Sequence, residues 1–328
     1  MTIFILTLFR TGYKLRTSTL YHLLVGKRTS SVLLHGFFYQ NLAFLGALPQ
    51  LKEAAFQEAI QQLAGQHLID IEAGYGQLTS SGEQLLVAEK VDLTGIDNLR
   101  FGRMREESWQ LILFSIQVTS HLSFNEKNYL PIEHRPYYLH QIKKWLAQSD
   151  QQLLAKIQQE LIETLESLPT DEANFLANQF SGHDFQGKTI FQLLPEKWKM
   201  EPWAELYRQR AIDSFLQALP EGEFKRLIDF LDQQNINRSM LKTKELFLTE
   251  KNVDEILILR RLKQGTINDH FIEWALLDEK FPFDRFELLS FEDMDIKEVI
   301  NAHYQSYDLS YLNFRLSQIY FLRKQLWN

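Results

Sequence analysis

The sequence predicts a mainly α-helical protein with an N-terminal winged-helix-like module, a helical middle region and a C-terminal helix-turn-helix module. Apolar residues recur every three to four positions over most of the chain, which is the period of amphipathic helices. One short stretch with a glycine turn, between residues 67 and 78, departs from that period and predicts a β-hairpin. The predicted modules span residues 1–95, 96–236 and 237–328, in keeping with a 328-residue chain that exceeds the usual size of one hydrophobic core.

The composition is that of a globular protein and excludes several kinds of site. Hydrophobic residues make up 45% of the chain and charged residues 23%, as in ordinary domains. Because cysteine is absent, disulfides, thiolate catalysis and cysteine-based zinc sites are excluded, and a reducing compartment, the cytoplasm, is expected. The apolar run from Ile3 to Phe9 is too short to span a bilayer, and its basic residues follow it instead of preceding it as in a signal peptide. We expect a buried helix there and no membrane contact.

Charge is distributed unevenly along the chain. The net charge of −7 argues against a protein that coats nucleic acid over its whole surface, because duplex affinity comes largely from cations that neutralise phosphates. Residues 1–52 nevertheless contain six basic residues and no acidic one, so the N-terminal end is basic and the rest of the chain is acidic. The alternative is a chance fluctuation in an apolar stretch. The six residues are Arg10, Lys14, Arg16, Lys27, Arg28 and Lys52.

The N-terminal module has the order of elements that is typical of a winged helix. An apolar face predicts a helix from Glu53 to Gly65, and two short strands, 67–71 and 75–78, follow it on either side of a glycine turn. Hydroxyl residues from Thr79 onward then offer caps for a helix expected from Glu83 to Glu89. Upstream, two further helices are expected at 17–25 and 30–41. A winged helix is a helix-turn-helix variant whose hairpin can lie along the DNA backbone.

Candidate DNA contacts in this module are cations and glutamines. Lys27, Arg28 and Lys52 are candidates for phosphate contacts. Gln57 and Gln61 are expected to point outward from the helix beside the hairpin, where a glutamine amide can pair with an adenine edge. Glu53 and Glu58 on the same helix weaken this interpretation, and the module could equally serve packing or protein contacts.

The middle region predicts consecutive helices that form a scaffold or a partner-binding surface. The segment from Pro131 to Pro136 interrupts them and must be irregular. The expected helices are 99–120, 139–149, 151–168, 171–180, 202–219 and 224–231.

The C-terminal third predicts three short helices, 241–248, 253–260 and 266–277. A tight glycine-containing turn, 262–265, joins the last two, and Asn252 and Thr266 are expected as N-caps or first-turn residues. This spacing is that of a helix-turn-helix. In its third helix, four residues are expected to face the core: Ile267, Phe271, Trp274 and Ala275. The residues expected nearer to solvent are Asn268, Asp269, His270, Ile272 and Glu273.

Three segments of this region resemble the helicase helix-turn-helix domain at the C-terminus of some RecQ-type helicases. They are 252–256 (NVDEI), 260–262 (RRL) and 265–274 (GTINDHFIEW). The same domain ends the YpbB-like bacterial proteins, which the whole chain resembles, including at 18–27 (STLYHLLVGK). The resemblance implies a non-catalytic accessory protein with a RecQ-type helicase as partner. In this interpretation the C-terminal unit presents Lys263, Thr266, Asn268 and His270 to DNA.

Two short motifs in the middle region suggest chemistry, but their context argues against it. Gly182 to Thr189 matches the phosphate-binding P-loop pattern formally, yet that mechanism needs a buried strand before the loop and a long helix after it, and Pro195 halts the following segment. His183 and Asp184 resemble a metal-binding pair without further ligands at suitable spacing. We therefore expect no catalytic residues, no metal and no cofactor.

The leading hypothesis from the sequence is a non-catalytic DNA-binding or helicase-accessory protein in DNA repair, recombination or replication. Its partners would be DNA and a RecQ-type helicase. One alternative is a helix-turn-helix transcription regulator, and another is a protein-interaction scaffold that does not contact DNA. The sequence leaves the oligomeric state open.

Overall fold

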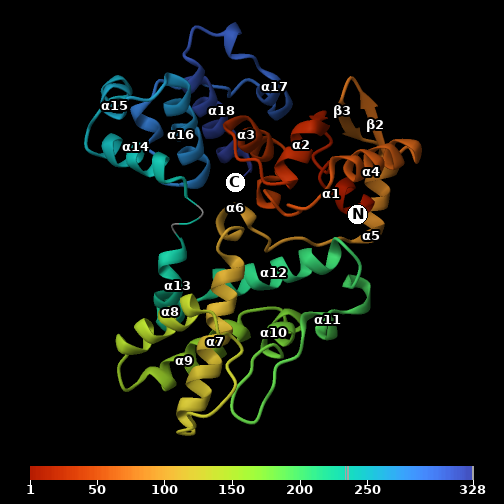
Figure 1. Cartoon of the computed structure of the whole chain (residues 1–328). Helices are drawn as coiled ribbons and strands as arrows, with labels where there is room; N and C mark the ends of the chain where they lie inside the picture. The colour runs from red at the N-terminus through yellow and green to blue at the C-terminus, as the bar shows by residue number, and fades with distance from the viewer. Residues whose placement is uncertain (233, 235, 327–328) are drawn as a thin grey trace. The chain divides into compact units, whose positions relative to one another are not determined.

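The computed structural model describes residues 1–232, 234 and 236–326 and is mainly α-helical with one small three-stranded sheet (Figure 1), which confirms the predicted fold class. The chain forms two compact units. We call residues 2–90 together with the chain from Ile236 onward the terminal unit, and residues 91–232 the middle unit. The changes of unit lie close to the predicted module boundaries. The first and third predicted modules, however, belong to one compact unit.

The N-terminal part of the terminal unit begins with a short buried helix, α1, as predicted. Thr79, the predicted cap of α5, accepts a hydrogen bond from the backbone N–H of Gly82 at 3.1 Å. The elements in chain order are α1 (Thr2–Thr7), β1 (Leu15–Arg16), α2 (Thr17–Leu24), α3 (Ser30–Phe38), η1 (Leu42–Phe44), α4 (Glu53–Gly65), β2 (Ile69–Glu72), β3 (Tyr75–Leu78) and α5 (Ser80–Glu89).

The sheet is antiparallel with the strand order β1-β3-β2. Ala73 and Gly74 connect β2 to β3 with φ angles of 49° and 82°, the left-handed pair that a tight two-residue hairpin needs. On β3, a Cβ atom at Gly76 would lie 2.6 Å from the ring of Phe9, so only glycine lets the strand approach this core residue. The sequence did not predict β1, because a two-residue strand has no period to detect.

The C-terminal part of the terminal unit contains the three predicted short helices and further helices after them. Asn252 forms a capping box with Glu255, as expected for a cap. The turn before α16 differs from the prediction, because its left-handed residue is Arg261 at φ 52° and Gly265 already lies inside α16. Thr266 lies in the first turn of α16, one of its two expected positions. The elements are α14 (Arg238–Leu248), α15 (Val253–Arg260), α16 (Gln264–Leu277), η4 (Phe283–Arg285), α17 (Ile296–Asn301), η5 (Tyr304–Ser306) and α18 (Tyr311–Leu326).

Helix α16 is the centre of the terminal unit. It contacts α14 and α18, which belong to the C-terminal part of the chain, and α3, which belongs to the N-terminal part (Figure 1). Phe271 and Trp274 on α16 pack against Phe247 of α14 at ring-centroid distances of 5.0 and 5.9 Å. Both rings are buried. The two ends of the chain therefore share one hydrophobic core.

The middle unit consists of the predicted run of helices. The expected helix 99–120 is divided into α6 and α7 at residues 102–104, and the remaining predictions hold to within a few residues. The elements are α6 (Asn98–Phe101), α7 (Arg105–Ser123), α8 (Pro136–Ala147), α9 (Leu153–Glu166), α10 (Thr170–Ala177), α11 (Ile190–Leu193), η2 (Glu196–Trp198), α12 (Trp203–Ala218) and α13 (Glu223–Asp232).

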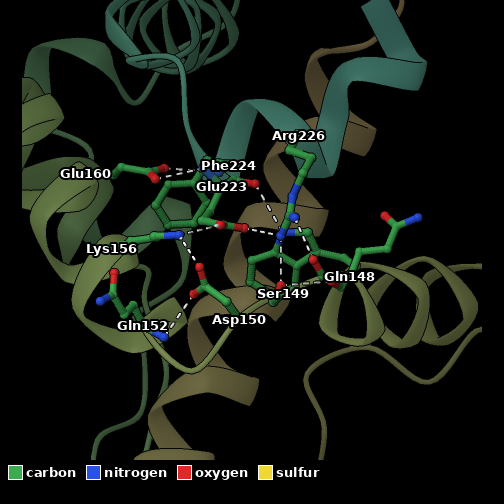
Figure 2. A network of polar contacts seen from close by, with 10 residues as sticks. Gln148, Ser149, Asp150, Gln152, Lys156, Glu160, Glu223, Phe224 and Arg226 are labelled. Carbon is green, nitrogen blue, oxygen red and sulfur yellow. Dashed lines mark hydrogen bonds and ion pairs between the residues drawn. The ribbon is translucent and has the colours of Figure 1, made fainter.

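A buried carboxylate joins α9 to the start of α13. Glu160 on α9 accepts hydrogen bonds from the backbone N–H groups of Glu223 and Phe224 at 2.7 and 3.1 Å (Figure 2). It thereby satisfies donors that the first turn of a helix leaves unpaired, and its charge is favourable at the positive end of the helix dipole. Around it, Lys156 and Arg226 pair with neighbouring carboxylates. This network fixes the angle at which α13 enters the core.

Acidification is expected to destabilise the terminal unit through His35 of α3. Burial lowers the pKa of His35 from 6.5 to about 4. The folded protein keeps the imidazole neutral while the unfolded chain protonates it below pH 6.5, so stability falls as the pH drops from 6.5 towards 4. Between pH 7 and pH 5 we expect a loss of about 2 kcal/mol.

Urea unfolding of the wild type and of His35→Leu at both pH values measures this loss. All other ionisable residues are the same in both proteins, so the difference between them isolates His35. An equal pH dependence in the two proteins would contradict the prediction.

Candidate nucleic-acid interface

Helix α4 presents a glutamine-rich face. Phe56, Ala59, Ile60 and Leu63 are buried on its inner side, as the apolar pattern predicted. The outer side carries small and amide side chains, so another molecule can approach its backbone closely. The residues of this outer face are Ala54, Ala55, Gln57, Glu58, Gln61, Gln62 and Gly65, of which Gln57 is half-buried and the others are exposed.

One acidic side chain lies in the middle of that face. Glu58 follows Ala54 by four positions and precedes Gln61 by three, which places it on the same helical stripe. A carboxylate at this position opposes the approach of phosphates. A helical projection of the sequence would have shown that Glu58 is central and Glu53 peripheral.

The β2–β3 hairpin follows α4 directly and leaves two apolar side chains exposed. Ile71 and Tyr75 are 41% and 43% exposed. The hairpin tip is held to the start of α2, because the backbone N–H and the hydroxyl of Thr17 both donate to the carbonyl of Gly74 at 3.1 Å. Glu72 on β2 pairs with Lys14. The hairpin therefore offers apolar contact more than positive charge.

Two of the predicted phosphate contacts are accessible cations. Lys27 lies in the turn between α2 and α3, and Lys52 immediately precedes α4. Both side chains are exposed, and neither forms an ion pair within the described part of the chain. Lys52, at the N-cap of α4, therefore lies next to the helix that carries Gln57 and Gln61.

Arg28 has an interior position instead. Its Nε donates to Oε1 of Glu273 at 2.7 Å, and the two side chains are only 11% and 8% exposed. A guanidinium engaged in this way is not presented to a phosphate. The sequence pattern could not reveal this partner, which is 245 residues away.

The expected solvent-facing side of α16 is largely covered. His270, Ile272 and Glu273 are 4%, 0% and 6% exposed, so the prediction that they lie nearer to solvent was wrong. The reason is that α3 packs along α16, where the hydroxyl of Ser30 also donates to Asp269 at 2.5 Å.

His270 is an interior residue of the three-helix arrangement. Its Nδ1 lies 2.9 Å from Oγ1 of Thr243 on α14, and burial lowers the pKa of the imidazole. Only the first turns of α16 remain accessible, with Lys263 exposed and Thr266 and Asn268 half-buried. The accessible C-terminal candidates are therefore confined to the start of the helix.

The segment Gly182–Thr189 closes on itself instead of forming a phosphate cradle. Gly182 and Phe185 exchange backbone hydrogen bonds, while the N–H groups of Gly187 and Lys188 donate to Ser181 Oγ and to the carbonyl of Asn178. The helix that follows, α11, has only four residues. A P-loop needs free amides at the start of a long helix.

The described residues contain neither a metal site nor a membrane-spanning helix. No cluster of three or more histidine, aspartate and glutamate side chains is arranged to hold a metal ion in this part of the chain. Within the same residues, no helix combines the length and the apolar character needed to cross a membrane.

Comparison with known proteins agrees with this arrangement of helices. A family described as "Helix-turn-helix domain" matches residues 239–320, which run from α14 into α18. The C-terminal segment is a helix-turn-helix domain. Protein YpbB of Bacillus subtilis (strain 168) is 22% identical over 275 residues, which cover 80% of this chain and 78% of the relative. No solved structure matches the chain. The helix-turn-helix domain suggests DNA binding, and the similarity to YpbB extends well beyond it.

Proposed function

We propose that this chain is a non-catalytic DNA-binding protein that contacts DNA mainly through α4 and the β2–β3 hairpin. The observation that carries the proposal is the accessible glutamine face of α4 next to a hairpin, in a chain that also has a helix-turn-helix domain. In a helix-turn-helix protein, an exposed helix lies in the major groove and reads base edges. Here the outer face of α4 is exposed, whereas most of α16 is buried.

The topology of the N-terminal part supports a winged-helix interpretation of this surface. The helix α4 leads directly into the antiparallel hairpin, and β1 adds a third strand beside β3. Gln57 and Gln61 can supply donor and acceptor groups to adenine, while Lys27 and Lys52 can neutralise phosphates. Ile71 and Tyr75 on the hairpin provide the apolar contact.

Within this proposal the chain acts in the cytoplasm as an accessory factor of DNA repair, recombination or replication. The resemblance of residues 252–274 to the corresponding domain of RecQ-type helicases supports such a helicase as partner. Unwinding would then belong to the partner.

Fluorescence anisotropy with duplex, forked and single-stranded DNA at two salt concentrations tests the proposal. We expect DNA binding to weaken as the salt concentration rises. In Lys52→Met, the slope of log K against log salt concentration should be smaller by about 1, because one phosphate contact is lost. Lys297→Met removes an exposed lysine from α17 and is the matched control. Absence of binding to every substrate at low salt would exclude direct DNA handling.

Removing the acidic group at the centre of the α4 face is expected to strengthen binding. Glu58→Gln keeps the shape of the side chain and eliminates one repulsive charge, so DNA affinity should rise about two- to fivefold at low salt, the equivalent of about 0.5–1 kcal/mol. Titration of the same duplex by anisotropy measures the change. Glu89→Gln on α5 is also exposed and should leave affinity unchanged. Equal effects of the two variants would show that net charge, and not the α4 face, determines affinity.

A second candidate function is a protein-interaction scaffold that does not contact DNA. The observation that favours it is the burial of α16, since His270, Ile272 and Glu273 lie inside the terminal unit and are not presented to a groove. A scaffold predicts no salt-dependent DNA binding, so the same titrations separate the two functions.

A further inference from the structure

The outer side of helix α15 is exposed and carries two aliphatic side chains. Its inner side packs against α14 and α16 through Ile256, which is fully buried. On the outer side, Ile258 is 77% exposed and Leu259 is 56% exposed. Isolated exposed aliphatic residues are common, but two neighbouring ones at this exposure mark a surface suited to contact with another molecule.

Charged residues flank this aliphatic pair with opposite signs. Asp254 and Glu255 are exposed one helical turn before Ile258 and Leu259, on the same side of the helix. Arg261 and Lys263 are exposed just after the pair. Asp254, Arg261 and Lys263 form no ion pair among the residues that the structure describes, whereas Glu255 lies 3.9 Å from Lys251.

This charge order is self-complementary. If two copies of α15 lie antiparallel with Ile258 and Leu259 at the twofold axis, the acidic end of each helix meets the basic end of the other. Asp254 precedes the pair by four positions, and Lys263 follows it by four, just beyond the end of α15 at Arg260, so in this arrangement the two residues lie at the same edge of the contact. Isologous dimers have exactly this reciprocal pairing of one surface with itself. Phosphates would instead be repelled by Asp254 and Glu255.

We propose that α15 is a self-association surface on which a second copy of this chain docks antiparallel. The aliphatic residues of the two copies pack at the centre, and Asp254 pairs with Lys263 of the other copy at each edge. Because a two-turn helix covers less than the roughly 800 Å² per partner of a standard interface, the dimer is weak, with a Kd on the order of 10–100 μM.

Sedimentation velocity of the full chain without DNA, from about 1 to 300 μM, tests the proposal around that expected Kd. The wild type should pass from monomer to dimer, and Ile258→Asp should remain monomeric while keeping its far-UV circular dichroism. Val87→Asp on α5 replaces a side chain of similar exposure, 71%, and should dimerise normally. A wild type that stays monomeric, or an Ile258→Asp variant that still dimerises, would overturn the proposal.

A charge exchange tests the antiparallel register. Asp254→Lys and Lys263→Glu each place like charges opposite one another, so each variant alone should dimerise at least tenfold more weakly than the wild type. An equimolar mixture should regain association as a heterodimer, which native mass spectrometry distinguishes by mass. Neither change touches the Asn252–Glu255 capping box. A mixture no stronger than the single variants would refute this pairing.

Discussion

Replacing Arg105 with methionine is expected to lower the free energy of unfolding of the middle unit by about 3–5 kcal/mol. Arg105 at the start of α7 binds both carboxylate oxygens of Asp213 on α12, at 2.6 and 2.5 Å. The two side chains are 4% and 0% exposed, so no water can replace the guanidinium. Methionine keeps much of the volume and leaves the buried carboxyl of Asp213 with the backbone N–H of Asp97 as its remaining donor among the described residues.

Hydrogen exchange measured by mass spectrometry suits this test, because it follows the two compact units separately. Protection of α7 and α12 should fall in Arg105→Met while protection of α16 is unchanged. Lys225→Met is the control, since its partner Glu221 is 88% exposed and such surface pairs contribute less than about 1 kcal/mol. Equal losses in the two variants would mean that burial does not determine the strength of the Arg105 pair.

Breaking the Arg28–Glu273 pair is expected to destabilise the terminal unit by about 3–5 kcal/mol. Glu273 accepts hydrogen bonds from Arg28 and, at 3.2 Å, from the amide of Asn237. In Arg28→Met, the carboxylate of Glu273 on α16 keeps only the neutral amide of Asn237 as a donor among the contacts described here, in a site that α3 covers. The change therefore loosens the contact between the two ends of the chain.

A double replacement separates the lost charge from the lost contact. Arg28→Met with Glu273→Met removes both charges and substitutes apolar surface, which is often neutral for a buried pair, so most of the stability should return. Lys27→Met, at the exposed neighbouring position, should change the free energy of unfolding by no more than about 0.5 kcal/mol. If the double variant is as unstable as Arg28→Met, the site depends on hydrogen bonds that methionine cannot replace.

The same pair affects how the DNA-binding proposal is tested. A charge reversal at Arg28 would remove DNA binding by disturbing the fold and would imitate the loss of a phosphate contact. Lys27 and Lys52 are free of such partners in the described chain, so variants at these two positions report on binding.

The sequence by itself determined the local structure of this protein. The apolar period located α4 and its buried face, and the glycine turn located the β2–β3 hairpin. Asn252 marked the start of α15 correctly, and the hydroxyl residues from Thr79 marked the start of α5 to within three residues. These features depend on residues within one or two turns of each other, and a linear pattern contains that information.

Only the tertiary structure decided which of these faces remain accessible. The helix α16 has the spacing of a recognition helix, yet α3 and α18 cover most of it, and Arg28 became an interior cation although it lies in a basic turn. Both outcomes depend on contacts between the first 40 residues and the last third of the chain. Burial of residues that are so far apart in the sequence depends on the shared core. Each apolar face gains stability only when another surface covers it, and a local pattern does not say which surface that is.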